Sequence, residues 1–301
     1  MSRVRPPRWP KPGADLALVA PAGAVPPAAL EAGLAALAAL APGSRLIVEE
    51  PVRASQGYLA GGDQERAAHL TRLLRDHSLG AVLAARGGFG SSRLLPLLDL
   101  EALAGGGACL LGFSDLTCLL GALAARGLAT LHGPVVTQLP RLDADSRADL
   151  AALLAGRPPF PGLLRGQGRR PGKAWGPLLG GNLTMLCHLL GTAWFPELGG
   201  AVLFIEDTGE AAYRLDRLLT QLELSGALAG VAGVAVGRLS DQASDPPDLV
   251  EAVAARLSGL GRPLVMGLPF GHGPANRLLP VGALAELDGG AGTLCVGLDL
   301  V

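Results

Sequence analysis

Ser114 is the first residue whose type and surroundings could carry out nucleophilic chemistry. It follows an apolar stretch and precedes a stretch of helical periodicity, in the segment Gly-Phe-Ser-Asp at 112–115. A serine on a tight strand-to-helix turn exposes its hydroxyl beside the free N–H groups of a helix N-terminus, which suit a developing oxyanion. A serine that only caps a helix is equally typical of this pattern, and the full G-x-S-x-G motif is absent. The local pattern leaves both interpretations open.

A base for such a nucleophile would be a histidine, and His272 is the best candidate of the five. Gly271 and Gly273 flank it just past an apolar run. Glycines on both sides let the backbone and the ring approach a ligand closely, although an ordinary turn histidine would also fit. The other four histidines have less suggestive surroundings. We expect His69 and His77 to be solvated and His188 to lie in the core or at an interface. We expect His132 to be structural or to line a cleft.

The acid that would orient this base is predicted at the end of another apolar run. Residues 202–205 lead directly into Glu206 and Asp207. A carboxylate at the end of a buried strand is costly without a partner, and ligand sites in open α/β sheets gather at such ends. Neighbouring strand residues point to opposite faces, so we expect only one of the two to serve, and Asp207 could instead cap the next helix. The order serine, acid, histidine is one by which unrelated folds build a catalytic triad.

Two glycine-rich segments could support a different chemistry. Residues 87–92 (Gly-Gly-Phe-Gly-Ser-Ser) could hold a phosphate, but they lack the ending of a P-loop and the G-x-G-x-x-G fingerprint. The same loop could donate a backbone N–H to an oxyanion hole. Residues 179–184 form a second glycine turn, for which simple entry into a helix is the alternative.

The elements that must position these residues alternate in the first half of the chain. Short apolar runs predict strands, and apolar residues at helical spacing separate them. The predicted strands cover residues 16–20, 46–48, 81–85 and 109–113, and the predicted helices cover 30–40, 63–77 and a segment after Ser114. Alternation of this kind predicts a parallel sheet covered on both faces.

The second half is richer in strands and follows a change in composition. Residues 140–175 are rich in Pro, Gly and Arg and show weak periodicity, apart from one short helix at 146–154. Strands are predicted at 202–206, 233–239, 264–268, 283–287 and 293–296, with helices at 182–190, 211–224 and 249–257. We therefore predict a first domain over 1–140, a connection over 141–175 and a second domain over 176–301.

Composition excludes several classes of protein. The 25 basic and 26 acidic residues give a net charge of −1, which predicts neither nucleic-acid binding nor attraction to a membrane surface. The basic N-terminal segment resembles a signal peptide, but Asp15 and several prolines interrupt its apolar stretch, so we expect a cytoplasmic protein. The four cysteines form no C-x-x-C pair and are interpreted as small buried residues. We expect neither disulfides nor a metal site.

Five segments, in order along nearly the whole chain, resemble the family of LD-carboxypeptidase A, which includes the microcin C self-immunity peptidases. They carry the sequences Arg-Gly-Gly-Phe-Gly at 86–90, Gly-Phe-Ser-Asp-Leu-Thr at 112–117, Leu-Leu-Gly-Gly-Asn-Leu at 178–183, Phe-Ile-Glu-Asp-Thr-Gly-Glu at 204–210 and Pro-Phe-Gly-His-Gly at 269–273. Phe89 and Phe113 stand where the family often has tyrosine, which puts one cleft hydroxyl in doubt but not the chemistry.

The resemblance implies a role for each matching residue. Ser114 would be the nucleophile, His272 the general base and Glu206 its orienting acid. The backbone N–H groups of Gly88 and Asp115 would form the oxyanion hole. Further residues would bind substrate, namely Gly87, Phe89, Trp175 and Asn182.

The resemblance also implies the fold and the reaction. The fold would be α/β, with a Rossmann-like N-terminal domain and a smaller strand-rich C-terminal domain, in a homodimer. The reaction would remove the terminal D-alanine of a murein tetrapeptide in the cytoplasm, without cofactor. Inactivation of a peptide–nucleotide antibiotic and a non-catalytic binding module are the alternatives, and the compact middle segment favours the murein reaction. The third residue of the peptide (diaminopimelate, lysine or ornithine) stays open.

Overall fold

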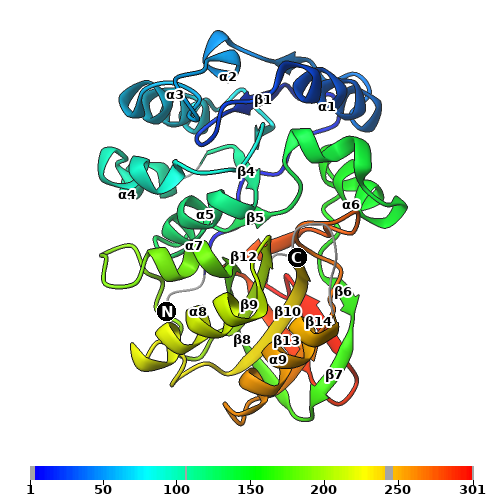
Figure 1. Ribbon diagram of the computed structural model, residues 1–301. Helices are drawn as coiled ribbons and strands as arrows, with labels where there is room; N and C mark the ends of the chain where they lie inside the picture. Colours follow the sequence, from blue (N-terminus) through cyan, green and yellow to red (C-terminus); the bar gives the residue numbers. More distant parts are fainter. Residues whose placement is uncertain (1–3, 106, 241–246, 300–301) are drawn as a thin grey trace.

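The computed structural model describes residues 4–105, 107–240 and 247–299, which fold around two β-sheets (Figure 1). One sheet lies in the upper half of Figure 1 with the blue and cyan helices, and the other lies below it. Within these residues, no helix has both the length and the apolar character needed to cross a membrane.

The first sheet has the strand order β12-β5-β4-β3-β1-β2. Its strands are β1 (Leu16–Val19), β2 (Leu46–Ile47), β3 (Ala81–Ala84), β4 (Cys109–Gly112), β5 (Thr130–His132) and β12 (Leu279–Val281). The first five run parallel, whereas β12 returns from the second half of the chain and pairs antiparallel with β5. Strands β1, β3, β4 and β5 are buried along their whole length, as expected for parallel strands with both faces covered.

Helices connect and cover these strands. They are α1 (Pro27–Leu40), α2 (Glu50–Arg53), α3 (Asp63–Arg75), α4 (Leu100–Ala104), α5 (Thr117–Ala124) and α6 (Ala144–Leu154), with the 3₁₀ helices η1 (Ser91–Leu97), η2 (Ser114–Leu116) and η3 (Val136–Arg141). Helix α3 buries Leu70, Leu73 and Leu74, the apolar face that its spacing predicted. The strands and helices predicted for the first half are confirmed to within a few residues.

The second sheet has the order β6-β14-β13-β8-β9-β10-β11-β7. Its strands are β6 (Gly162–Arg165), β7 (Gln167–Arg170), β8 (Lys173–Asn182), β9 (Val202–Thr208), β10 (Gly233–Ser240), β11 (Leu264–Met266), β13 (Leu284–Asp288) and β14 (Thr293–Val296). Strands β8 to β11 are parallel, and antiparallel strands extend the sheet on both sides. Its helices are α7 (Leu183–His188), α8 (Ala212–Leu224) and α9 (Pro247–Ser258). The predicted fold class, an α/β protein with a parallel first sheet and a strand-rich second part, is confirmed.

The segment 141–175 differs from its prediction. The expected short helix is α6, but β6, β7 and the start of β8 were not expected there. Strands β6 and β7 lie at the two edges of the second sheet, and all four residues of β7 are exposed. Edge strands with polar, exposed side chains lack the apolar alternation by which strands are recognised. The glycine turn expected at 179–184 is instead the end of β8, up to Asn182, followed directly by α7. The division into two domains and a connection stays a prediction.

Candidate active site

Ser114 lies where β4 has ended and η2 begins, between the two sheets. Its φ is +63°, the only positive φ of a non-glycine residue in the part of the chain that the structure describes. Such a conformation is costly for an L-residue and is typical of functional turns. No side-chain hydrogen bond caps η2 or α5, so the interpretation of Ser114 as a helix cap is wrong. Thr117 holds the turn, because its Oγ1 donates to the Ser114 carbonyl at 2.7 Å.

The glycine-rich loop after β3 packs directly on this serine. A Cβ atom at Gly87 would lie 3.1 Å from the Cβ of Ser114 and 3.3 Å from its Oγ. Only a residue without a side chain lets the loop approach the hydroxyl this closely. Asp115 ties the same loop to the serine turn, since its Oδ2 accepts the N–H of Ser91 at 2.8 Å and its carbonyl accepts the Ser91 hydroxyl.

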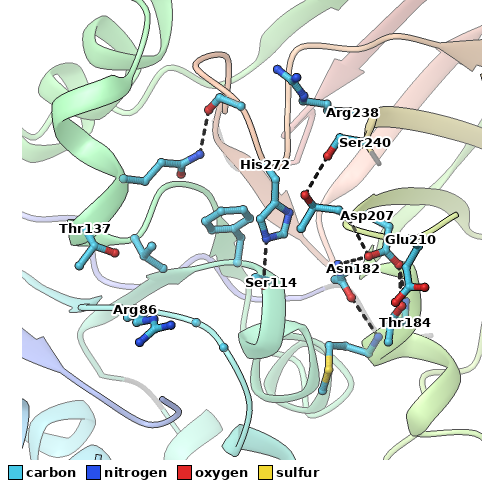
Figure 2. A pocket seen from close by; sticks show the side chains of 18 of the residues that line it. Arg86, Ser114, Thr137, Asn182, Thr184, Asp207, Glu210, Arg238, Ser240 and His272 are labelled. Carbon is cyan, nitrogen blue, oxygen red and sulfur yellow. Dashed lines mark hydrogen bonds between the residues drawn. The ribbon is translucent and has the colours of Figure 1, made fainter. Parts of the chain in front are cut away.

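The structure brings the hydroxyl of Ser114, the ring of His272 and the carboxylate of Glu206 into one hydrogen-bonded chain (Figure 2). Nε2 of His272 lies 3.1 Å from Oγ of Ser114, and Nδ1 lies 2.6 Å from Oε2 of Glu206. Glu206 is fully buried in β9, and His272 enters from the loop between β11 and β12. A Cβ at Gly271 would lie 2.8 Å from Glu206 Oε2, so glycine permits the contact.

Glu206 and His272 shift each other's pKa values. Burial by itself raises the pKa of Glu206, but the charge of His272 and its hydrogen bond outweigh burial and lower the pKa. Burial by itself lowers the pKa of His272, whereas the negative charge of Glu206 and the same hydrogen bond raise it overall. The carboxylate is therefore ionised, and the imidazole has an increased affinity for a proton.

Two buried amides hold the His272 loop in place. Gln138 Nε2 donates to the carbonyl oxygens of Gly273 and Gly271, at 2.9 and 3.3 Å. Asn276 Oδ1 accepts the N–H of Gly271 at 3.0 Å, and its Nδ2 donates to Gln138 Oε1 at 2.9 Å. Sequence reasoning missed both residues. An amide within the apolar run 135–139 was the available signal, since a buried amide needs partners.

Asp207 caps a helix, but not the one that was expected. Its Oδ2 accepts the N–H of Thr184 at 2.9 Å, and its Oδ1 accepts Nδ2 of Asn182 at 3.0 Å. These contacts lie at the start of α7, which precedes Asp207 in the chain, whereas the predicted cap was for the following helix. Asn182 Oδ1 in turn accepts the N–H of Met185 at 3.1 Å. Burial and the nearby charge of Glu206 raise the pKa of Asp207.

A cavity of about 650 Å³ opens above Ser114 and His272. Gly87, Gly88 and Asn182 line it, and their expected roles toward a substrate stay predictions. Its charged lining residues have both signs and come from both halves of the chain. They are Arg86, Arg141, Asp207, Glu210 and Arg238. Figure 2 shows Arg86 on one side of Ser114 and Asp207 and Glu210 on the other.

Two residues expected near the substrate lie outside this lining. Trp175 is 53% exposed near the start of β8, whereas Asn182 ends that strand, roughly 23 Å further along. The structure therefore does not bring Trp175 into the cavity. Phe89 follows Gly88, is 43% exposed and packs 6.1 Å from the ring of Tyr58. A role for Phe89 stays a prediction.

Two histidines differ from their expected surroundings. His69 is buried in α3 with its Nε2 3.1 Å from Glu49, although solvation was expected. The helix face that carries it packs inward, and the carboxylate of Glu49 lies beside the ring. His188 is exposed at the end of α7, so a core position is wrong. Of the cysteines, Cys109, Cys118 and Cys187 are buried and Cys295 is partly buried.

A serine hydroxyl, an imidazole and a buried carboxylate in this order form the arrangement of serine-type hydrolases. Two family models match the chain, the LD-carboxypeptidase N-terminal domain over residues 16–133 and the LD-carboxypeptidase C-terminal domain over residues 175–287. The chain belongs to the LD-carboxypeptidase family and is a serine-type LD-carboxypeptidase.

Individual relatives agree with this assignment. The murein tetrapeptide carboxypeptidase of Pseudomonas aeruginosa is 35% identical over 291 residues, which cover 91% of this chain and 93% of the relative. A Streptomyces coelicolor protein predicted to be a carboxypeptidase is 42% identical over 97% of this chain and 95% of its own. The crystal structure of muramoyltetrapeptide carboxypeptidase from Oxalobacter formigenes superposes with a TM-score of 0.79 at 31% identity, covering 93% of this chain and 97% of that one.

Proposed function

We propose that this protein hydrolyses the bond between the L-centre of the third residue and the terminal D-alanine of murein tetrapeptides. The observation that carries the proposal is the hydrogen-bonded chain from Ser114 through His272 to Glu206 at the floor of a cavity. The relatives named for murein and muramoyl tetrapeptides support the substrate class. We place the reaction in the cytoplasm, as a step of peptidoglycan recycling.

In the proposed mechanism, Ser114 Oγ attacks the carbonyl carbon and His272 Nε2 accepts its proton. The same proton passes to the departing amine, so D-alanine leaves and an ester to Ser114 remains. Water then attacks this ester, again through His272, and releases the tripeptide. Glu206 keeps the proton of the neutral ring on Nδ1 and stabilises the imidazolium that forms, which the upward shift of the His272 pKa supports.

The oxyanion that forms at each step would be held by the backbone N–H groups of Gly88 and Asp115. Gly88 lines the cavity, and Asp115 directly follows the nucleophile. The contacts between Asp115 and Ser91 support the proposal, because they fix the glycine loop relative to the serine turn. Donors fixed before the reaction stabilise a developing charge without reorganisation.

The cavity lining suits the ends of such a peptide. Its arginines can pair with carboxylates of the substrate, and Glu210 can pair with an amine.

We further propose that the protein forms a homodimer, which sedimentation of the purified protein would test. Neither a cofactor nor a metal takes part in the proposed reaction.

The experiment is incubation with a purified murein tetrapeptide, followed by mass analysis of the products. We expect a tripeptide and free D-alanine, and no release from the matched peptide that ends in L-alanine. A parallel incubation with a peptidyl nucleotide separates the antibiotic-inactivating alternative. Cleavage of the nucleotide conjugate together with an intact tetrapeptide would contradict the proposal, and binding without cleavage of either would favour a binding module.

A further inference from the structure

A second histidine lies behind the catalytic residues with no evident role in the mechanism. His132 ends β5 and is completely buried. Its backbone pairs with Gly112, two residues before the nucleophile, and with Leu279 of β12. Neither of its ring nitrogens has a hydrogen-bond partner among the described residues.

Aromatic rings enclose His132 and place it close to the triad. Its ring centroid lies 5.2 Å from Phe204 and 5.7 Å from Phe113, both nearly edge-on. Phe204 precedes Glu206 by two residues on β9, so both side chains lie on the same face of that strand. Phe113 also contacts the His272 ring, at 4.7 Å. His132 therefore packs against two phenylalanines, of which Phe113 contacts His272 and Phe204 shares a strand face with Glu206.

One carboxylate oxygen of Glu206 lacks a direct hydrogen-bond donor on this buried side. Its Oε2 accepts the proton of His272 Nδ1, but its Oε1 is buried without a hydrogen-bond partner in the described structure. An ionised carboxylate oxygen left without a donor in the interior is costly. The side-chain amide of Asn182, which donates to Asp207, also acts on the Glu206 carboxylate and lowers its pKa, but it makes no direct hydrogen bond to Oε1. Oε1 of Glu206 and the ring nitrogens of His132 thus all lack a direct partner in the described structure, and the charge of Glu206 acts on His132.

The charged groups around this place determine which form His132 takes. Burial lowers the pKa of His132 to about 4, and the positive charge of His272 acts in the same direction against the attraction of Glu206. Asp207 and Arg238 act on the His272 side of the pair. A neutral imidazole carries one N–H and one acceptor nitrogen, so His132 can donate one hydrogen bond at the pH of catalysis.

We propose that His132 is a positioning residue that donates, through one buried water molecule, to Oε1 of Glu206. The water accepts from the imidazole N–H and donates to the carboxylate, which satisfies one nitrogen of His132 and the orphaned oxygen together. Buried waters in proteins typically take this bridging role between otherwise unpaired polar groups. The inference rests on the proposed function, because it assigns His132 to the support of the catalytic acid.

Loss of the donor to Oε1 should shift the pH dependence of catalysis in one direction. A donor to Oε1 stabilises the carboxylate and so reduces the proton affinity of the coupled Glu206–His272 pair. Removing the donor leaves the negative charge more exposed to His272. The acid limb of the pH profile of kcat/KM should then move to higher pH, in contrast to a change that removes the charge of Glu206 itself.

The first test compares His132→Phe with His132→Gln on the murein tetrapeptide. The Phe variant keeps an aromatic ring at this position but removes both ring nitrogens. We expect its kcat to fall roughly tenfold with KM unchanged, and its acid limb to rise by about one pH unit, as for loss of one hydrogen bond. The Gln variant supplies an amide N–H as donor, so its kcat and its acid limb should lie close to those of the wild-type protein. Thr130→Val is the matched control, since Thr130 lies on the same strand, is fully buried, and donates to the Leu120 carbonyl at 3.1 Å. It should lower stability without moving the pH profile.

A second measurement does not require activity. In the Ser114→Ala protein with labelled histidine, NMR titration should show His132 neutral throughout the range in which His272 titrates. The His272 pKa should be higher when His132→Phe is added. If the His272 pKa in the Ser114→Ala protein is unchanged by His132→Phe, the proposal is overturned. An atomic-resolution crystal structure with no water between His132 and Glu206 would overturn it as well. If the wild-type protein fails to cleave the tetrapeptide while these shifts appear, the proposed substrate is wrong and the role of His132 stands.

Discussion

At the scale of single residues, the site depends on a serine held in a backbone conformation that serine rarely adopts. Its φ of +63° keeps Oγ clear of the helix that follows and within reach of His272. The cost of such a conformation is of order 1–3 kcal/mol. Contacts around the turn must therefore offset it, and the bond from Thr117 to the Ser114 carbonyl is one of them.

Removing the hydroxyl should separate chemistry from binding. Ser114→Ala is expected to reduce kcat for the tetrapeptide by roughly 10⁴–10⁶-fold, because no other atom can form the ester to the enzyme. Folding and substrate affinity should change little, since the hydroxyl is small and lines the cavity. Single-turnover kinetics and calorimetric binding measure the two effects. Near-normal turnover would exclude Ser114 as the nucleophile.

The charge of Glu206 should appear in the pH profile. Because His272 must be neutral to accept a proton and its pKa is raised, activity should fall as pH drops through a value above the ordinary ~6.5. In Glu206→Gln the carboxylate charge is gone while burial remains, so the acid limb should move to lower pH. The same variant should lose roughly 10²–10⁴-fold in kcat, less than Ser114→Ala. An acid limb that stays in place would show that Glu206 does not set the His272 pKa.

Residue types and their neighbours were enough to nominate these three side chains. Ser114, Glu206 and His272 each follow an apolar run. A carboxylate at the end of such a run is recognisable from the sequence alone as a buried charge that needs a partner. The orphaned nitrogens of His132 could not be seen in this way. They depend on which aromatic rings the fold gathers around the residue, and Phe113, Phe204 and Phe270 come from three separate segments.

At the scale of elements, Thr117 links the turn at Ser114 to the second sheet. Its Oγ1 donates to the Ser114 carbonyl and accepts the N–H of Asn182, at 2.9 Å, where β8 ends. One hydroxyl at the start of α5 thus fixes the end of a strand from the other half of the chain. The position of the serine relative to the second sheet depends on this contact.

Thr117→Val should therefore damage both stability and catalysis. The change keeps the shape but leaves the buried N–H of Asn182 and the Ser114 carbonyl without this partner, at a cost of about 1–3 kcal/mol in the free energy of unfolding. We expect a lower melting temperature and a reduced kcat. Thr192→Val is a suitable control, because Thr192 is exposed and its hydroxyl bonds within its own turn, donating to the Leu189 carbonyl and accepting the N–H of Trp194. Equal effects of the two variants would contradict the assigned link.

Apolar periodicity predicted the buried elements well and the edge elements poorly. Strands such as β3 and β9 are buried and carry their signal in their own residues. Strands β7 and β12 do not, because β7 is exposed and β12 is a three-residue segment that contains Pro280. Their strand conformation comes from the partners β11 and β5 that the tertiary fold provides.

At the scale of the whole molecule, the cavity takes residues from both sheets. Arg86 and Gly88 come from the first half of the chain, whereas Glu210 and His272 come from the second. A peptide that fills the cavity must contact both parts. Binding should therefore stabilise the molecule as a unit.

A thermal shift experiment tests this expectation. In the Ser114→Ala protein, murein tetrapeptide at 100 times its dissociation constant should add about 2.7 kcal/mol to the free energy of unfolding and raise the single melting temperature. The peptide ending in L-alanine should produce a smaller shift at equal concentration. Two separate transitions, of which only one responds to the peptide, would show that the substrate contacts one part alone.

The return of β12 to the first sheet has a consequence for biosynthesis. A chain leaves the ribosome from its N-terminal end, and domains fold as they emerge. The first sheet, however, still lacks its last strand when β5 has been made, and Ser114 precedes its partner His272 by 158 positions. Because β12 follows His272, the sheet is completed only after the base has been translated. We therefore expect a nascent chain to gain hydrolytic activity only after both His272 and the last strand of the first sheet have been made.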